Sequence, residues 1–194
     1  MNEIIADRGN IRYEREPPLI LLLLLSFDGL TEKSVGDLQM DDDMNYDIIA
    51  NKDYTPSMHT AEHILNQTMV RLYNCGRAFS AHIEKKKSKC DYRFDHNLSE
   101  NEIKEIEEKV NLVISGNYPV FEEFMTRDEA GKFFNLDRLP ETAGERLRVM
   151  KVGDYDSCLC SGKHCSNTSE IKPFKIISTG FENGVLRIRF KLAD

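Results

Sequence analysis

The sequence predicts an α+β fold: an antiparallel-rich sheet with helices packed on one of its faces. Two observations predict this class. Helical and strand-like hydrophobic patterns follow one another in mixed order along residues 45–194. Near the end of the chain, Asn183-Gly184 separates two strand-like runs, and this dipeptide is typical of a tight hairpin between antiparallel strands.

Two long helices are expected in the first half of this region. The first opens at Pro56, which suits a first helical turn, and ends at Gly76, with apolar residues recurring at spacings of three and four between them. The second begins at Ser99, which forms a capping box with Glu102, and ends at Gly116.

The remaining elements are shorter. A third capped helix is expected from Thr126 to Phe134. Strand-like or extended runs are expected at residues 79–84, 90–95, 119–125, 147–152, 174–179 and 185–192. In the last run, apolar residues alternate with arginine and lysine, as in a strand with one buried face.

Charge is distributed unevenly along the chain, whose net charge is -7. Residues 1–50 contain 4 Lys and Arg against 11 Asp and Glu, whereas residues 51–194 contain 22 of each. Any affinity for nucleic acid must therefore come from a local basic patch. We divide the chain into an acidic extension over residues 1–44, either a disordered leader or the product of a start codon assigned too early, and one domain over residues 45–194.

Cysteine usage and hydropathy argue against two classes of protein. The five cysteines are odd in number and unevenly spaced, which does not suit a secreted disulfide framework and indicates reduced thiols in the cytoplasm. The apolar run Leu19–Leu25 is far shorter than the roughly 20 residues that a membrane-spanning helix needs. We therefore expect a cytoplasmic protein without a membrane partner.

Two distant pairs of residues carry the types of side chain that bind metals. His59 and His63 are four residues apart on the first predicted helix, so both imidazoles project from one face. Cys160 and His164 repeat the spacing about a hundred residues later, among turn-forming residues that place them on a loop after a strand. Three imidazoles and one thiolate are a suitable set for tetrahedral zinc.

A rival interpretation uses the first pair differently. Residues 59–63 also fit the H-x-x-E-H pattern of zinc peptidases, in which Glu62 would be the general base. We rank this interpretation lower, because those enzymes take a further carboxylate ligand from a later helix. Of the remaining four cysteines, Cys75, Cys90 and Cys158 are interpreted as small buried hydrophobic residues, and Cys165 is closer to the site but directly follows His164, which competes for the same ion.

Two stretches resemble a known family. Residues 59–65, HTAEHIL, and residues 160–171, CSGKHCSNTSEI, are similar to the two motifs of the editing domain of alanyl-tRNA synthetases and of its free-standing relatives. This domain is also called the second additional domain of threonyl- and alanyl-tRNA synthetases. The similarity spans roughly residues 55–180 in a consistent order.

The resemblance implies an editing-domain-like α+β fold that binds zinc through His59, His63, Cys160 and His164. It also implies trans-acting hydrolysis of the ester in a misacylated tRNA, typically serine or glycine on alanine tRNA. The motifs further suggest pocket contacts, with a helix-surface, capping or turn role as the alternative for each residue: Thr60, Thr168 and Glu170. One departure affects specificity, since Ser161-Gly162-Lys163 stands where the family usually has Gly-Gly-Thr.

A dense run of lysines is the candidate surface for RNA. The expected contacts to the phosphates of the tRNA acceptor end are Lys85, Lys86, Lys87, Lys89 and Arg93. The alternative is a solvated hairpin tip without a partner. The second hypothesis for the function, ranked after hydrolysis, is a non-catalytic, zinc-stabilised module that binds tRNA or a synthetase.

Overall fold

The structure is a computed structural model that describes residues 55–137, 139 and 143–193. The expected acidic extension over residues 1–44 and the apolar run Leu19–Leu25 lie outside this part of the chain. Among the described residues, no helix combines the length and the apolar character that crossing a membrane requires.

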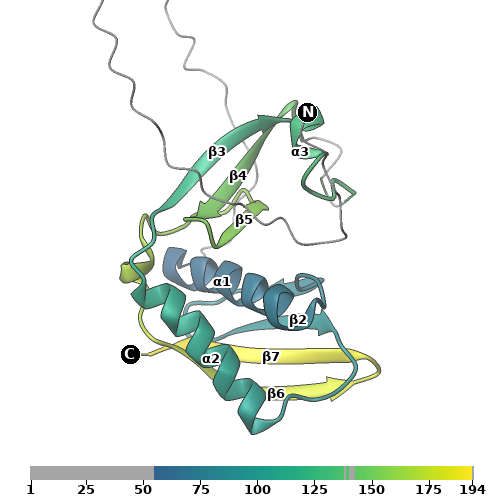
Figure 1. The fold of residues 1–194 in the computed structure, drawn as a ribbon, viewed down its shortest axis with the longest axis vertical. Helices are drawn as coiled ribbons and strands as arrows, with labels where there is room; N and C mark the ends of the chain where they lie inside the picture. Colours follow the sequence, from purple (N-terminus) through teal and green to yellow (C-terminus); the bar gives the residue numbers. More distant parts are fainter. Residues whose placement is uncertain (1–54, 138, 140–142, 194) are drawn as a thin grey trace, which may run out of the picture. The chain divides into compact units, whose positions relative to one another are not determined.

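Four antiparallel strands form the larger of two sheets, in the order β1-β2-β7-β6 (Figure 1). The strands are β1 (Ser80–His82), β2 (Ser88–Arg93), β6 (Phe174–Glu182) and β7 (Val185–Leu192). Asn183 and Gly184 join β6 to β7 with φ angles of 51° and 76°. Both values are positive, as a two-residue hairpin of this kind requires, so the predicted hairpin is confirmed.

Two long helices cover one face of this sheet (Figure 1). They are α1 (Pro56–Tyr73) and α2 (Glu100–Ser115). α1 starts with proline as predicted, but it ends before Gly76 because Asn74 adopts the left-handed conformation and donates its N–H to Val70 O. α2 starts at the predicted capping box, in which Ser99 and Glu102 bond reciprocally.

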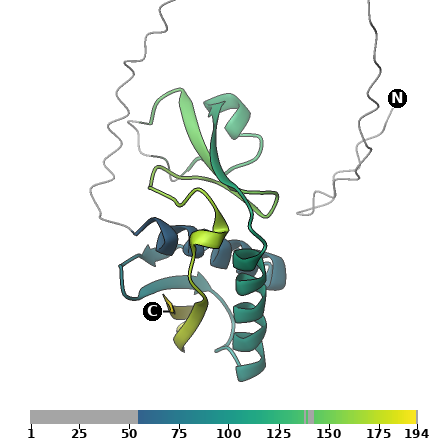
Figure 2. The same ribbon diagram turned by 90° about the vertical axis from the view of Figure 1, so that its left-hand side faces the viewer.

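A second, three-stranded antiparallel sheet has the order β3-β4-β5. It consists of β3 (Val120–Thr126), β4 (Arg146–Val152) and β5 (Asp156–Leu159), with the short helix α3 (Arg127–Ala130) after β3. In both views α1 lies between the two sheets (Figures 1 and 2). The predicted α+β class is confirmed. The strands, however, form two sheets rather than the single sheet that was expected. The sequence does not predict β5, whose four residues show no apolar alternation, and α3 stops short of Phe134.

The main core lies between the four-stranded sheet and its two helices. Leu186, Ile188 and Phe190 of β7 are all 0% exposed, and so are Ala61 and Leu65 of α1. Burial of each large apolar side chain contributes about 1.5–3 kcal/mol. This packing fixes α1 against the sheet and turns its other side toward β5, which it contacts.

Candidate metal centre

The first two donors come from α1. His59 and His63 are one helical turn apart, and both are buried, at 8% and 3% exposure. A buried imidazole pair is costly unless its nitrogens find partners. The partners come from the loop that follows β5.

This loop carries Cys160 and His164 and is held by hydrogen bonds to its backbone. Arg148 of β4 donates from Nη1 to the carbonyl oxygens of Cys160, at 3.1 Å, and of Gly162, at 2.8 Å. Gly162 packs so closely on His59 that an added Cβ would lie 2.2 Å from its Cε1 atom. Glycine is therefore required here for close approach rather than for an unusual backbone angle.

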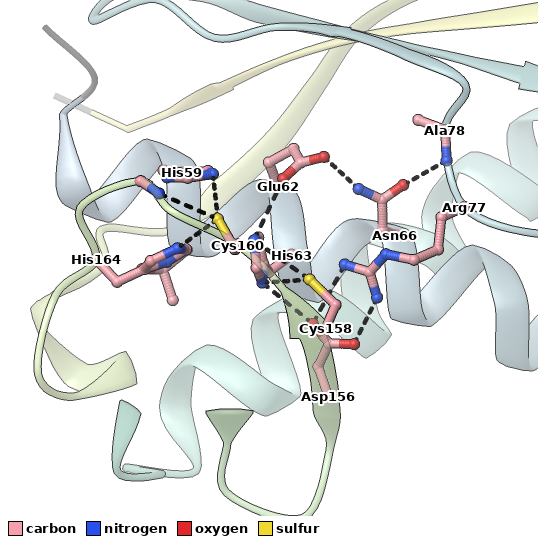
Figure 3. Close-up of polar contacts among 12 residues, drawn as sticks. His59, Glu62, His63, Asn66, Arg77, Ala78, Asp156, Cys158, Cys160 and His164 are labelled. Carbon is pink, nitrogen blue, oxygen red and sulfur yellow. Dashed lines mark hydrogen bonds and ion pairs between the residues drawn. The ribbon is translucent and has the colours of Figure 1, made fainter. Parts of the chain in front are cut away.

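The four donors converge (Figure 3). One ligand atom from each of His59, His63, Cys160 and His164 lies within 4.8 Å of all the others. Cys160 Sγ is 3.5 Å from His59 Nε2 and 3.4 Å from His164 Nε2. A zinc tetrahedron with ordinary bond lengths has N···S edges of about 3.5 Å, so these two distances match the edges of a metal site.

Hydrogen bonds on the far side of two rings determine which nitrogen faces the sulfur. His59 Nδ1 lies 3.1 Å from Lys163 O, a carbonyl that can only accept, so Nδ1 carries the proton. His164 Nδ1 lies 3.1 Å from Thr60 Oγ1, which already donates its hydrogen to Pro56 O at 3.0 Å. His164 Nδ1 must therefore be the donor. In their neutral forms both rings point an Nε2 lone pair at one sulfur.

The electrostatics of the cluster favour a cation between these groups. Burial and the neighbouring histidines lower the pKa of His164 to about 4, so this ring is neutral at pH 7. Burial would raise the pKa of Cys160, but interactions with His164, His59 and His63 outweigh it and lower that pKa to about 3. A thiolate that faces the unprotonated nitrogen of a neutral ring places two lone pairs against each other, which is repulsive. A divalent cation between the two atoms would remove this repulsion. The residues present therefore fit zinc.

A second group of side chains surrounds His63 on its other edge (Figure 3). His63 Nδ1 lies 3.3 Å from Asp156 Oδ2 and 3.5 Å from Cys158 Sγ. Arg77 holds the same carboxylate from the other side, at 2.6 and 3.3 Å. Burial would raise the pKa of Asp156, but Arg77 and His63 outweigh it and lower that pKa. Asp156 is therefore an ionised acceptor that orients the His63 ring.

Sequence reasoning misses this group. It predicts an inert buried hydrophobic residue at Cys158, but the thiol is half-buried and contacts the His63 ring. The overlooked signal is a spacing of two, since Asp156, Cys158 and Cys160 alternate along an extended segment and share a face. Asp156, Cys158 and His63 could form a metal triad of their own. The Arg77 guanidinium on Asp156 opposes a second cation there.

Comparison with known proteins now places the domain. The model of the threonyl and alanyl tRNA synthetase second additional domain matches residues 147–189, which include β4, β5 and the Cys160–His164 loop. The chain belongs to this domain family. Alanine–tRNA ligase of Fervidobacterium nodosum is 36% identical over 132 residues, which are 67% of this chain and 15% of that protein.

Other relatives give the same result. Alanine–tRNA ligase of Bdellovibrio bacteriovorus is 34% identical over 143 residues, 72% of this chain and 16% of the ligase. The corresponding ligase of Methanopyrus kandleri is 31% identical over 144 residues, 70% of this chain and 15% of the ligase. The chain thus matches only about a sixth of the length of these curated relatives.

Glu62, the base that the peptidase interpretation requires, lies beside the candidate centre, with its Oε2 4.0 Å from His63 Nε2. It is buried, and its Oε1 accepts a hydrogen bond from Asn66 Nδ2. Asn66 in turn accepts from the backbone N–H of Ala78 at 2.8 Å. Glu62 is therefore tied into α1 and the segment that follows it.

The three pocket candidates make internal contacts. Thr60 is 0% exposed and bonds to His164 and to the N–H of Cys165. Thr168 is also 0% exposed, and its Oγ1 accepts from the N–H of Tyr118 at 2.9 Å. Glu170 is exposed, but its Oε1 accepts from Ser166 and Asn167 as a cap. Thr60 is therefore not the helix-surface residue of its alternative interpretation, and it bonds to a candidate ligand. Glu170 acts as a cap, and a pocket role for these three residues stays a prediction.

The lysine run lies on the outside of the domain. Lys85, Lys86 and Lys87 are exposed in the turn between β1 and β2, and Lys89 follows on β2. Arg93 does not join them. It lies at the opposite end of β2, where its guanidinium covers the Phe79 ring at 4.4 Å.

An open hollow of about 520 Å³ is found on the three-stranded sheet. Its lining comes from β3, α3 and their surroundings, and includes Glu122, Phe124 and Phe133. It shares no residue with the donor cluster. The chemistry of the cluster, rather than this hollow, therefore defines the candidate site.

Proposed function

We propose that this domain hydrolyses the ester bond of misacylated tRNA at a zinc centre formed by His59, His63, Cys160 and His164. The observation that carries the proposal is the convergence of three imidazoles and a thiolate within 4.8 Å. Membership of the second additional domain family supports it, because the relatives are alanine–tRNA ligases. The substrate class that the family resemblance implies is serine or glycine on alanine tRNA.

The roles of the residues follow from their contacts. Cys160 and the three histidines would hold the ion, and Asp156 with Arg77 would keep His63 in one orientation. Thr60 would do the same for His164. When bound, zinc would act as a Lewis acid toward the ester carbonyl or hold the amino group of the aminoacyl moiety.

A second candidate is a non-catalytic module that binds tRNA or a synthetase. One observation favours it: four protein donors fill a tetrahedral site, whereas catalytic zinc keeps a position open. Hydrolysis at this centre therefore requires either that one donor leaves or that zinc only positions the substrate.

The test is deacylation of a tRNA panel by the zinc-loaded protein. Alanine tRNA charged with serine, glycine or alanine would be followed as release of labelled amino acid, with and without a chelator. We expect turnover of at least one mischarged species, loss of turnover in Cys160→Ala, and its retention in Glu62→Gln. Absence of turnover on every species, with tRNA binding intact, would establish the non-catalytic module instead.

A further inference from the structure

The face of the four-stranded sheet that the helices do not cover carries a cluster of cations. β7 alternates strictly: Leu186, Ile188 and Phe190 are buried against the helices, so Arg187, Arg189 and Lys191 project from the opposite face. The neighbouring strand β2 contributes to the same face. In the register, Lys89 lies directly opposite Arg189, and Asp91 lies opposite Arg187.

The cations of this face differ in whether they are neutralised. Arg187 forms two hydrogen bonds to Asp91, at 2.7 and 2.8 Å. Among the residues that the structure describes, by contrast, Lys89, Arg189 and Lys191 form no ion pair with a carboxylate. Of the further carboxylates near this face, Glu182 lies at the β6–β7 hairpin, at the opposite end of β7 from Lys191, and Glu84 in the β1–β2 turn pairs with His82 at 2.7 Å. The positive charge is therefore concentrated at one end of the sheet.

The arrangement costs stability in the absence of a partner. Lys89 faces Arg189 across β2 and β7. Lys175 faces Lys191 across β6 and β7, but Lys175 also forms an ion pair with Glu107 of α2 at 3.8 Å. Like charges in directly opposed cross-strand positions repel each other and destabilise a sheet. An anionic ligand along β7 would relieve the repulsion between Lys89 and Arg189.

The cationic end of the sheet is also the end at which the metal ligands lie. β1 runs back along α1, since the N–H of Ala78 bonds to Asn66, midway along that helix. The β1–β2 turn with Lys85, Lys86 and Lys87 therefore lies toward the first turns of α1, which carry His59. β7 ends there too, because its last residues pair with β6 at Phe174 and with β2 at Ser88 (Figure 1).

We propose that this basic patch, formed by Lys85, Lys86, Lys87, Lys89, Arg189 and Lys191, binds the phosphate backbone of the tRNA whose acceptor end reaches the metal centre. Arg189 and Lys191 on β7 extend the lysine run of the β1–β2 turn onto the sheet. The basic patch is therefore a surface of the domain and not only the tip of a loop. The choice of tRNA as the polyanion rests on the proposed function. The patch would bind the RNA backbone without reading its sequence.

The experiment measures binding of uncharged tRNA to the zinc-loaded full chain by fluorescence anisotropy over a range of salt concentrations. In Arg189→Ala/Lys191→Ala we expect the dissociation constant to rise about tenfold. The slope of log K against log salt should fall by about 2, because two phosphates are no longer neutralised. The matched control, Lys109→Ala/Lys132→Ala, removes the same charge from exposed positions outside the patch and should bind as wild type.

A second variant protects the test against misfolding. Lys85→Ala/Lys86→Ala/Lys87→Ala changes only exposed side chains of a turn, and it should weaken tRNA binding in the same way with an unchanged melting temperature. Binding of both patch variants equal to wild type would overturn the proposal, as would equal losses in patch and control variants. Loss of binding to polyglutamate with tRNA binding unchanged would instead assign the patch to an acidic protein.

The outcome is separable from that of the proposed function. Binding is measured with uncharged tRNA and involves no chemistry, so a wild-type protein that hydrolyses no ester can still lose tRNA through the patch variants. Conversely, hydrolysis of a mischarged tRNA with unchanged binding by the patch variants would leave the catalytic proposal standing and remove this one.

Discussion

The two sides of α1 are both buried, but they differ in what their burial requires. The side toward the four-stranded sheet carries Met58, Ala61, Leu65 and Met69, none more than 2% exposed, and its burial is favourable without any specific partner. The side toward β5 carries polar side chains that are almost as buried, including His59 at 8% and His63 at 3%. Burying those groups is costly unless each polar atom is satisfied.

This difference shows that the local sequence alone specifies only the apolar side of α1. The apolar side needs residues of suitable size and spacing, and many combinations would serve. The polar side depends on particular atoms supplied from about a hundred residues later, namely those of Cys160 and His164. Mutations on the two sides should therefore separate stability from metal binding.

The largest effect is expected at the thiolate. Cys160→Ala removes the anionic donor, so we expect zinc content to fall from about one ion per chain to none. Wild-type protein should gain about 4 kcal/mol of stability from zinc at 1,000 times its dissociation constant, and the variant should gain nothing. Native mass spectrometry and thermal melts with added zinc measure both. Cys75→Ala, a half-buried thiol remote from the cluster, is the control.

A cavity on the apolar side should give the reverse result. Leu65→Ala is expected to lower the free energy of unfolding by about 2–5 kcal/mol, because it deletes a fully buried side chain from the core. Zinc content should stay at that of the wild type. Chemical denaturation gives the first quantity and metal analysis the second.

The exposed Leu112 on α2 offers a matched substitution. Leu112→Ala should change the unfolding free energy by no more than about 0.5 kcal/mol. If Leu65→Ala also emptied the metal centre while the protein remained folded, the two sides of α1 would be coupled and the comparison would fail.

The same contrast explains what can be predicted from the sequence. The α1 and α2 starts, the β6–β7 hairpin and the α+β class follow from periodicity, capping boxes and turn residues, all of which are local. Two paired motifs are sufficient to select His59, His63, Cys160 and His164 as candidate ligands. The second sheet escapes prediction because β5 is short and polar, and its position depends on pairing with β4.

The contacts behind the ligands cannot be predicted for a related reason. Asp156 and Cys158 contribute to the surroundings of His63 only once β5 packs beside α1. The sequence allows a surface or pocket role for Thr60, because nothing in its neighbours indicates that His164 lies against it. Charge on β7 is visible as alternation, but its opposition to Lys89 requires the β2–β7 register.

An intermediate effect is expected at the carboxylate behind His63. Asp156→Asn keeps the size of the side chain but removes the charge that orients the ring and pairs with Arg77. We expect zinc affinity to fall about 10–100-fold, as for other residues that orient a metal-bound histidine. Competition with a chromophoric chelator measures it. Asp154→Asn, an exposed carboxylate two residues away, should leave the affinity unchanged.

The smallest effect is expected at Thr60. Thr60→Val has nearly the same shape but lacks the oxygen that accepts from His164 Nδ1 at 3.1 Å. Loss of one such hydrogen bond, worth about 1 kcal/mol, should weaken zinc binding roughly fivefold. The same chelator competition resolves a change of this size.

The best control is on the same helix. Thr68 is also a buried threonine, and its Oγ1 bonds to Ile64 O and to the Tyr155 hydroxyl, both at 2.8 Å, without touching a candidate ligand. Thr68→Val should lower the melting temperature while leaving zinc affinity intact. Equal affinities for zinc in the two variants would mean that His164 is held by its loop alone. The hydroxyl of Thr60 would then serve only to donate to Pro56 O within α1 and to accept from the Cys165 backbone N–H.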